Sequence, residues 1–260
     1  MEMEGRVAFI TGAASGIGKA TAFTCAREGA SVLVADVNID AAKKVAADIG
    51  KAARPIALDV TSEASWTDAF AEVDKTYARL HTLVNCAGVG VAGNFEETTL
   101  ADWQTIMDVN LTGVFLGCKH AIALMRKTGT DASIVNISSI AGLVGGEDIA
   151  AYSASKGGVT MLTKSVALHC GRHAQNVRCN SVHPTYVNSE MLDSVAAQFP
   201  SREDMLKGMA DLVPLGKVAE PQDIADMILF LSTEKARMIS GAQMLVDGAQ
   251  LAGLPAKHSV

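Results

Sequence analysis

Residues 7–18 read Val-Ala-Phe-Ile-Thr-Gly-Ala-Ala-Ser-Gly-Ile-Gly, an apolar run that passes directly into a glycine-rich turn. The run is typical of a buried parallel strand, and a helical pattern begins at Gly16. A turn between a strand and a helix offers unpaired N–H groups and the positive end of the helix dipole to an anion. Its glycines let the backbone approach a pyrophosphate. We therefore predict a dinucleotide site at Gly12, Ser15, Gly16, Ile17 and Gly18, with a purely structural turn as the alternative.

The rest of the chain repeats this alternation. From Arg6 to about Asp247, short β-branched runs alternate with longer Ala-rich segments of helical periodicity. The predicted strands are Val7–Thr11, Ser31–Asp36, Arg54–Val60, His81–Asn85, Ser133–Ser138, Val177–Val182 and Gln243–Val246. The predicted helices are Gly16–Glu28, Ile39–Gly50, Ser62–Ala78, Asp102–Lys127, Ala151–Gly171 and Pro221–Ser232. The pattern predicts one α/β domain over residues 1–260, a doubly wound parallel sheet of about seven strands with helices on both faces.

Composition and charge narrow the classes of function. The 260 residues include 22 Lys and Arg against 28 Asp and Glu, a net charge of −6 that gives no sign of a nucleic-acid partner. No apolar run is long enough to span a bilayer, so no membrane partner is expected. The acidic start does not resemble a signal peptide, and the five cysteines form no Cys-x-x-Cys pair. We expect a cytoplasmic protein with reduced thiols and no metal site.

Asp36 ends the second predicted strand and bears on the choice of cofactor. A carboxylate at this position accepts hydrogen bonds from an adenosine ribose and repels a 2′-phosphate. Neither Val37 after it nor Ser15 in the turn supplies a compensating cation, and Lys19 is the one basic side chain nearby. We therefore predict NAD rather than NADP. A solvated aspartate at a strand end is the alternative.

Tyr152 and Lys156 are four residues apart in a predicted helix, so their side chains project from one face. A fixed cation beside a phenol favours the phenolate, which predicts that the pKa of Tyr152 lies below its ordinary value of about 10. Ser139, at the end of an apolar run, can bring a hydroxyl to the same place. The alternative for the pair alone is a surface lysine beside a half-buried tyrosine.

Further motifs accompany these residues in a fixed order. They are Asp59-Val60, Asn85-Cys86-Ala87-Gly88, Asn110, Ser139, Tyr152-x-x-x-Lys156 and Asn180-x-x-x-Pro184, all downstream of Thr11-Gly12-x-x-x-Gly16-Ile17-Gly18. With this set the chain resembles the short-chain dehydrogenase/reductase family over essentially its whole length. The resemblance implies a Rossmann-type fold and hydride transfer between a secondary alcohol and NAD.

The resemblance also implies a role for each matching residue. Asp59 and Val60, together with Asn85, Ala87 and Gly88, are expected on the adenosine side of the cofactor. Pro184, Val187 and Ser189 are expected to hold the nicotinamide carboxamide, and Tyr152 and Lys156 also touch the cofactor. The catalytic set implied is Asn110, Ser139, Tyr152 and Lys156, in which Asn110 bends its helix and orders a water beside Lys156. A helix cap for Asn110 and a plain strand end for Asp59 are the alternatives.

Three residues depart from the family pattern. Cys86 replaces the second Asn of Asn-Asn-Ala-Gly, and Ser189 replaces the usual Thr while it keeps the hydroxyl. Thr185 stands where Gly normally follows the proline, so the conformation of this loop is open.

The segment 184–216 is long and carries Tyr186, Phe199 and several methionines, among them Met191 and Met209. Methionine-rich apolar surface adapts to bulky ligands, so we expect a lid over a hydrophobic, alicyclic or steroid-like alcohol or ketone, with simple helix packing as the alternative.

Glycines in the helices around 113–117 and 157–158 indicate close packing, and the resemblance implies a homodimer or homotetramer. The rival functions are a 3-oxoacyl carrier-protein reductase, with Arg126, Lys127 and Arg172 meeting an acidic partner, and a catalytically silent NAD-binding regulator.

Overall fold

A computed structural model describes residues 1–90, 93–197 and 199–253 of the chain. The strand–turn–helix unit at the start of the chain forms as predicted, from β1 (Val7–Thr11) into α1 (Gly16–Arg27). Every residue of β1 is buried, as expected for a strand covered on both faces.

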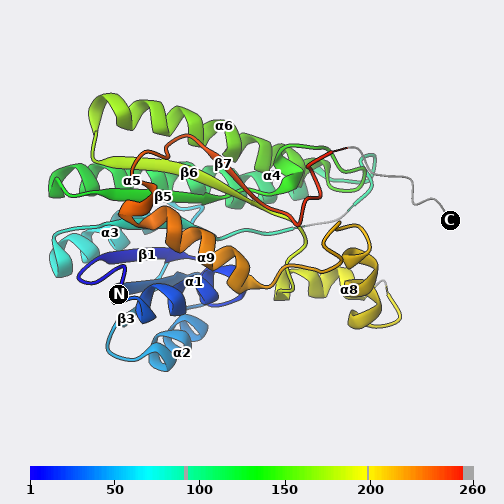
Figure 1. Cartoon of the computed structure of the whole chain (residues 1–260), viewed down its shortest axis with the longest axis horizontal. Coiled ribbons are helices and arrows are strands. Elements are labelled where there is room, and N and C mark those ends of the chain that lie inside the picture. Colours follow the sequence, from blue (N-terminus) through cyan, green and yellow to red (C-terminus); the bar gives the residue numbers. More distant parts are fainter. Residues whose placement is uncertain (91–92, 198, 254–260) are drawn as a thin grey trace.

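One parallel sheet of seven strands carries the fold (Figure 1), in the order β3-β2-β1-β4-β5-β6-β7. Beyond β1 the strands are β2 (Ser31–Asp36), β3 (Ala53–Ala57), β4 (Thr82–Asn85), β5 (Ala132–Ile137), β6 (Val177–Pro184) and β7 (Gln243–Val246). The chain crosses from one half of the sheet to the other between β3 and β4. Because β1 and β4 are neighbours, the sheet changes direction there, and ligands of such sheets bind beyond the strands' carboxyl ends at this point.

The helices divide between the two faces of the sheet, as predicted. One core cluster contains residues of α1, α2 (Ile39–Ile49) and α9 (Pro221–Ser232) together with side chains from the strands. The second cluster joins the other strand face to α3 (Glu63–Tyr77), α5 (Gly113–Thr128) and α6 (Ala150–His173). No helix in the described ranges combines the length and apolarity needed to cross a membrane.

The predicted helix Asp102–Lys127 is not one regular helix. It consists of α4 (Leu100–Met107) and α5, separated by a π-helical turn at Asp108–Thr112. Periodicity alone predicted continuous helix because the extra residue of a π turn rotates the apolar face without removing it. The predicted strand Arg54–Val60 also ends earlier, at Ala57, because Asp59 turns the chain by accepting hydrogen bonds from the N–H and hydroxyl of Thr61.

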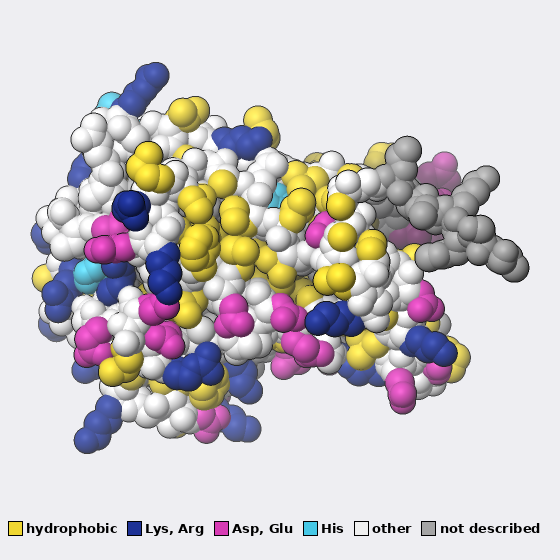
Figure 2. All heavy atoms as spheres, viewed as in Figure 1, with side chains coloured by type: hydrophobic (Ala, Val, Ile, Leu, Met, Phe, Trp, Pro, Cys, Tyr) yellow, Lys and Arg dark blue, Asp and Glu magenta, His cyan; other side chains and the backbone are white. Residues whose placement is uncertain are grey.

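The segment after β6 contains more helix than the sequence indicated. It forms a 3₁₀ turn at Glu190–Leu192, the short helix α7 (Asp193–Ala196) and α8 (Arg202–Ala210). Figure 1 shows α8 at one end of the molecule, well away from α2. On the face drawn in Figure 2, basic and acidic side chains are interspersed around a central band of hydrophobic ones.

Candidate active site

A cavity of about 850 Å³ opens at the carboxyl ends of the strands. Its wall includes residues that follow β1, β2, β4, β5 and β6. The predicted site residues that line it are Gly12, Ser15, Gly16, Ile17, Gly18, Asp36, Asp59, Val60, Ala87, Gly88, Ser139, Tyr152, Lys156, Pro184, Val187 and Ser189. The structure therefore brings together segments from residue 12 to residue 189 around one space.

The glycine turn has no room for side chains. Gly12 has a φ of +62°, and a Cβ there would lie 2.8 Å from the Cα of Ala87. A Cβ on Gly18 would lie 2.2 Å from the carbonyl oxygen of Gly12. Thr11 closes the far side, because its Oγ1 accepts the N–H groups of Cys86 and Ala87, both at 3.0 Å. The open backbone and the N-terminus of α1 fit the pyrophosphate of a dinucleotide.

Asp36 is fixed in the cavity wall by the backbone around it. Its two carboxylate oxygens accept the N–H of Ala14 at 3.0 Å and the N–H of Asn38 at 2.9 Å. Each oxygen keeps a further lone pair that a ribose hydroxyl can reach. Of the described residues that line the cavity, Lys156 is the only lysine or arginine. Lys19, the one basic side chain that the sequence places nearby, lines a neighbouring cavity that shares Gly16, Ser189 and Glu190 with this one.

Ser139, Tyr152 and Lys156 meet at one end of the cavity. The Lys156 Nζ lies 5.5 Å from the centre of the Tyr152 ring and donates a 2.9 Å hydrogen bond to the carbonyl oxygen of Ile137. Burial lowers the pKa of Lys156 to about 8. Burial also raises the pKa of Tyr152, and a hydrogen bond with the Ser139 side chain opposes that rise.

The predicted direction of the Tyr152 pKa is therefore wrong for the protein groups alone. The reason is that the phenol and the ammonium lie in the same poorly solvated site, where burial disfavours both charges. A lowered pKa would need a further positive charge in the cavity.

Asn85 and Asn110 do not line the cavity. The Asn85 amide, expected on the adenosine side, is buried and donates to Asn136 Oδ1 at 2.9 Å, because the side chain packs under α5. Asn110 lies in the π turn, so the bend in its helix agrees with the expectation. Its side chain accepts the N–H of Val89 at 2.8 Å and donates to the Val89 carbonyl and to Ser155 Oγ. Both amide hydrogens thus have protein partners, and the ordered water remains a prediction.

His183, which the sequence analysis missed, holds the backbone of Ser139 through a hydrogen bond to its carbonyl oxygen. It is fully buried, and its Nδ1 lies 3.0 Å from the Ser139 carbonyl oxygen while its Nε2 lies 2.8 Å from Ser181 Oγ. Because a carbonyl only accepts, Nδ1 must carry the proton. Burial lowers the pKa of His183, which favours the neutral ring. The alternation His183–Ser181 along β6 was visible in the sequence, but its partner 44 residues away was not.

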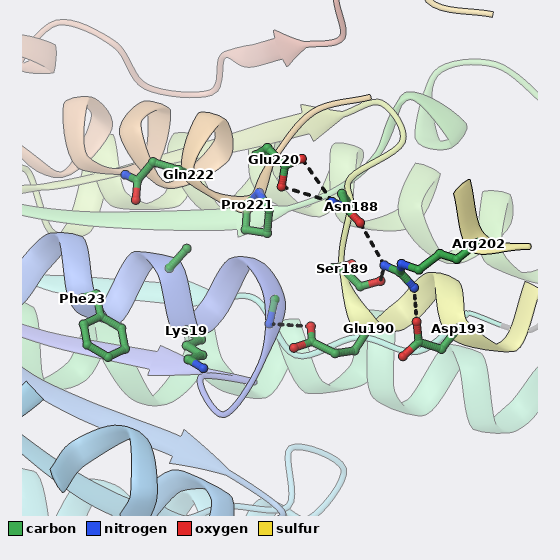
Figure 3. A pocket seen from close by; sticks show the side chains of 12 residues that line it. Lys19, Phe23, Asn188, Ser189, Glu190, Asp193, Arg202, Glu220, Pro221 and Gln222 are labelled. Atoms are coloured by element: carbon green, nitrogen blue, oxygen red, sulfur yellow. Dashed lines mark hydrogen bonds and ion pairs between the residues drawn. The ribbon is translucent and has the colours of Figure 1, made fainter. Parts of the chain in front are cut away.

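Glu190 is a second residue that the sequence analysis missed. Its carboxylate accepts the N–H of Gly16 at 3.0 Å, at the start of α1, where we expected the pyrophosphate to bind. Figure 3 shows Glu190 reaching toward α1, beside a neighbouring cavity of about 610 Å³. Arg202 fixes the same segment, because it pairs with Asp193 and donates to Asn188 Oδ1 at 2.9 Å.

A parallel sheet with a glycine turn and a Ser–Tyr–Lys set at its carboxyl edge defines a dinucleotide-binding oxidoreductase. The family model described as "enoyl-(acyl carrier protein) reductase" matches residues 12–249. The NADP-dependent (R)-specific alcohol dehydrogenase of Lentilactobacillus kefiri is 36% identical over 252 residues, 96% of this chain and 98% of that protein. The chain belongs to the short-chain dehydrogenase/reductase family.

Other similar proteins are named as dehydrogenases of hydroxysteroids or of a hydroxycyclohexane compound. The 3-alpha-(or 20-beta)-hydroxysteroid dehydrogenase of Mycobacterium bovis is 39% identical over 250 residues, 96% of this chain and 91% of that protein. The trans-4-hydroxycyclohexanecarboxylate dehydrogenase of Sinomonas cyclohexanicum is 38% identical over 257 residues, 95% of this chain and 93% of that protein. The chain is thus an oxidoreductase of a family that uses a nicotinamide dinucleotide.

Proposed function

We propose that the protein interconverts a hydrophobic secondary alcohol and its ketone with NAD(H). The observation that carries the proposal is the lining of one cavity. Asp36 and the glycine turn line the same cavity of about 850 Å³ as Ser139, Tyr152 and Lys156, which supports a dinucleotide and an alcohol sharing one site. Relatives named as alcohol and hydroxysteroid dehydrogenases support the reaction class.

The chain's own residues supply positioning and proton transfer. When bound, the dinucleotide accepts or donates the hydride. In alcohol oxidation Tyr152 takes the hydroxyl proton, and Ser139 holds the substrate oxygen by a hydrogen bond. Burial raises the pKa of Tyr152, and the positive charge of an oxidised nicotinamide would add to that of Lys156 in opposing this rise. Asn110 holds the Val89 segment and the end of the π turn in place, and we retain the water beside Lys156 as part of the proposal.

We propose NAD rather than NADP because of charge. A 2′-phosphate would lie against Asp36, and no lysine or arginine of the described wall faces that end of the cavity. The Lentilactobacillus relative is NADP-dependent by name, so the family itself does not decide the cofactor. Asp36 is the residue that carries this part of the proposal.

Several apolar residues that are not among the expected cofactor contacts also line the cavity. They are Val144, Ile149, Leu192, Val195 and Met209. Tyr186 and Met191 also line the cavity, whereas Met205 is fully buried and Phe199 is 42% exposed, so the apolar residues of the 184–216 segment have divided roles. An apolar wall of this kind supports an alicyclic or steroid-like substrate.

Steady-state assays with NAD and NADP and a panel of primary, alicyclic and steroid alcohols test the proposal. We expect kcat/KM with NAD to exceed that with NADP by at least about tenfold, since each 1.4 kcal/mol corresponds to tenfold. Asp36→Ala combined with Val37→Arg should reverse the preference. A wild type that prefers NADP would overturn the cofactor assignment. Dinucleotide binding without turnover of any alcohol or ketone would instead favour a silent NAD-binding regulator.

The structure weakens the case for a carrier-protein reductase. Lys127, one of the basic residues that would meet an acidic partner, already pairs with Asp74 at 2.9 Å. The same assays include a 3-oxoacyl thioester, for which we expect low activity. The five free thiols are consistent with a reducing, cytoplasmic location, which we retain as part of the proposal.

A further inference from the structure

Thr185 has a specific partner in the cavity wall. This residue replaces the glycine usual after the proline, and the structure shows how the loop accommodates it. Its N–H donates to the Val246 carbonyl at 3.2 Å, which prolongs the pairing of β6 with β7, and its φ lies outside the left-handed region. The side chain faces the cavity, where Oγ1 donates a hydrogen bond to Gln250 Oε1.

Gln250 is held in the wall by a rigid turn after β7. Asp247 is buried, and its two carboxylate oxygens accept the N–H groups of Ala249 at 3.0 Å and Leu251 at 2.9 Å. Ala249 has a φ of +71°, a left-handed conformation that is strained for a residue with a Cβ. Gly248 is left-handed as well, and its carbonyl accepts the N–H of Leu215. The turn thus gives Gln250 a defined place at the cavity.

The Gln250 amide has hydrogen-bonding capacity that the protein does not use. A glutamine side chain offers two donors and one acceptor. Within the described residues its one side-chain hydrogen bond is that with Thr185. The oxygen and nitrogen ends of such an amide are assigned rather than observed, but either orientation leaves one end for a ligand.

The charge of the wall decides which ligand group fits. Lys156 is the only lysine or arginine among the described lining residues, and it lies beside Tyr152. A carboxylate on the substrate would therefore find no second cation and would lose its hydration without compensation. A hydroxyl or a ketone oxygen can use the amide at little desolvation cost.

We propose that Thr185 and Gln250 form a subsite for a second, uncharged polar group on the substrate. The inference rests on the proposed function and narrows its substrate class to ring alcohols and ketones that carry a further hydroxyl or carbonyl. Thr185 orients the Gln250 amide, and Gln250 contacts the substrate.

The experiment compares matched ring ketones in reduction with NADH. The substrates are 3- and 4-hydroxycyclohexanone, their methyl counterparts of similar shape, and 4-oxocyclohexanecarboxylate. We expect wild-type kcat/KM for the hydroxy ketone to exceed that for the methyl ketone by about three- to tenfold, at the 3-position, the 4-position or both. This is the net effect of one hydrogen bond. Gln250→Leu should abolish this ratio and leave the methyl ketones within about twofold. Thr185→Val should reduce the ratio, and the carboxylate should be the poorest substrate.

Gln104→Leu, the same change on the exposed surface of α4, serves as the control and should keep the wild-type ratio. A ratio near one at both ring positions in the wild type would overturn the subsite. Equal loss on hydroxy and methyl ketones in Gln250→Leu would do the same, because it would indicate a structural effect.

A binding measurement separates this inference from the proposed function. Calorimetric titration of the wild-type–NAD complex with the same ketones, which the oxidised cofactor cannot reduce, gives the hydroxy-to-methyl affinity ratio without turnover. If no ketone is reduced, the proposed function fails, while a Gln250-dependent affinity ratio would still support the subsite. If no ketone is reduced and the hydroxy-to-methyl affinity ratio is also near one, both the proposed function and the subsite are refuted.

Discussion

Tyr152 shares a poorly solvated corner with Ser139 and Lys156, and the protein groups alone raise its pKa. Removal of its hydroxyl removes the group that transfers the proton. In Tyr152→Phe we expect kcat to fall by about 10²- to 10⁴-fold, the usual contribution of general acid–base catalysis. The dissociation constant for NADH, measured by fluorescence titration, should change by less than about threefold. Turnover close to that of the wild type would refute the role.

Lys156 makes stability depend on pH in a direction that can be worked out. Burial lowers its pKa from 10.5 to about 8 in the folded state, so below pH 8 the folded protein bears the cost of a buried charge. Between pH 8 and 10.5 the unfolded chain holds more protons, and the free energy of unfolding rises with pH. The rise totals about 3 kcal/mol.

Urea denaturation of the wild type and of Lys156→Met checks this prediction. The difference between the two free energies of unfolding should be constant below pH 8 and should then shift in favour of the wild type. Groups that titrate in both proteins cancel in this difference. A difference that stays flat up to pH 10.5 would show that the lysine is not depressed.

Glu190 competes for the Gly16 N–H with the cofactor's pyrophosphate, in the arrangement that we propose. Glu190→Gln removes the negative charge at this helix N-terminus and should tighten NADH binding by about three- to tenfold at low salt. The gain should shrink as salt screens the repulsion. Glu203→Gln, an exposed residue of α8, is the control in the fluorescence titration. Weaker binding in Glu190→Gln would show instead that the carboxylate supports the site.

At the scale of elements, contacts within the chain explain Gly117 of α5 and Gly158 of α6. A Cβ on Gly117 would lie 2.3 Å from Asn85 Oδ1 and 2.9 Å from Trp66, and one on Gly158 would lie 2.7 Å from Leu111. Close packing was predicted from the cost of glycine in helices, and the structure confirms it at these positions. Gly157 differs, because its nearest contact would be an ordinary 3.7 Å.

These two kinds of glycine give a matched pair of substitutions. Gly117→Ala should lower the free energy of unfolding by about 1–3 kcal/mol, because Asn85 is hydrogen-bonded to Asn136 and has no space to yield. Gly157→Ala should raise it by up to about 1 kcal/mol through helix propensity. Chemical denaturation measures both. Equal effects would contradict the packing account.

The π turn at Asp108–Thr112 shows what a periodic pattern leaves out. The sequence predicted apolar helix through this region, and the helical backbone does continue there. The local geometry depends on Asn110, whose amide satisfies both backbone groups of Val89, a residue in a distant loop. A side chain that forms a turn through a tertiary contact cannot be found from the periodicity of its own segment.

At the scale of the whole molecule, the strand pattern was sufficient for the parallel sheet because buried strands and amphipathic helices alternate without interruption. The site was predictable where a motif holds its residues close in sequence, as at Gly12–Gly18 and Tyr152–Lys156. It was not predictable where the contact joins distant segments. Glu190 and Gly16 are 174 residues apart, and Thr185 and Gln250 are 65 residues apart. Neither pair has a local signal.

The quaternary structure stays a prediction, and exposed apolar side chains support it. Phe115 on α5 and Met161 and Leu168 on α6 are 49%, 62% and 72% exposed. We expect light scattering to give the mass of a dimer or tetramer. Met161→Glu with Leu168→Glu should reduce that mass, whereas Met238→Glu, outside both helices, should not. A wild-type monomer at micromolar concentration would contradict the expectation.

The buried cysteines allow unfolding of the unmodified protein to be followed by thiol labelling. Cys25, Cys118, Cys170 and Cys179 are buried, and Cys86 alone borders the cavity. Because these four side chains are buried, a reagent reaches their thiols only when the fold opens, and burial also raises the pKa of Cys25 to about 12. Timed labelling followed by mass spectrometry would thus record unfolding events in the unmodified chain. Burial raises the pKa of Cys86 to about 12 as well, so only a further slowing of its labelling when a dinucleotide is added would report that the cavity is filled.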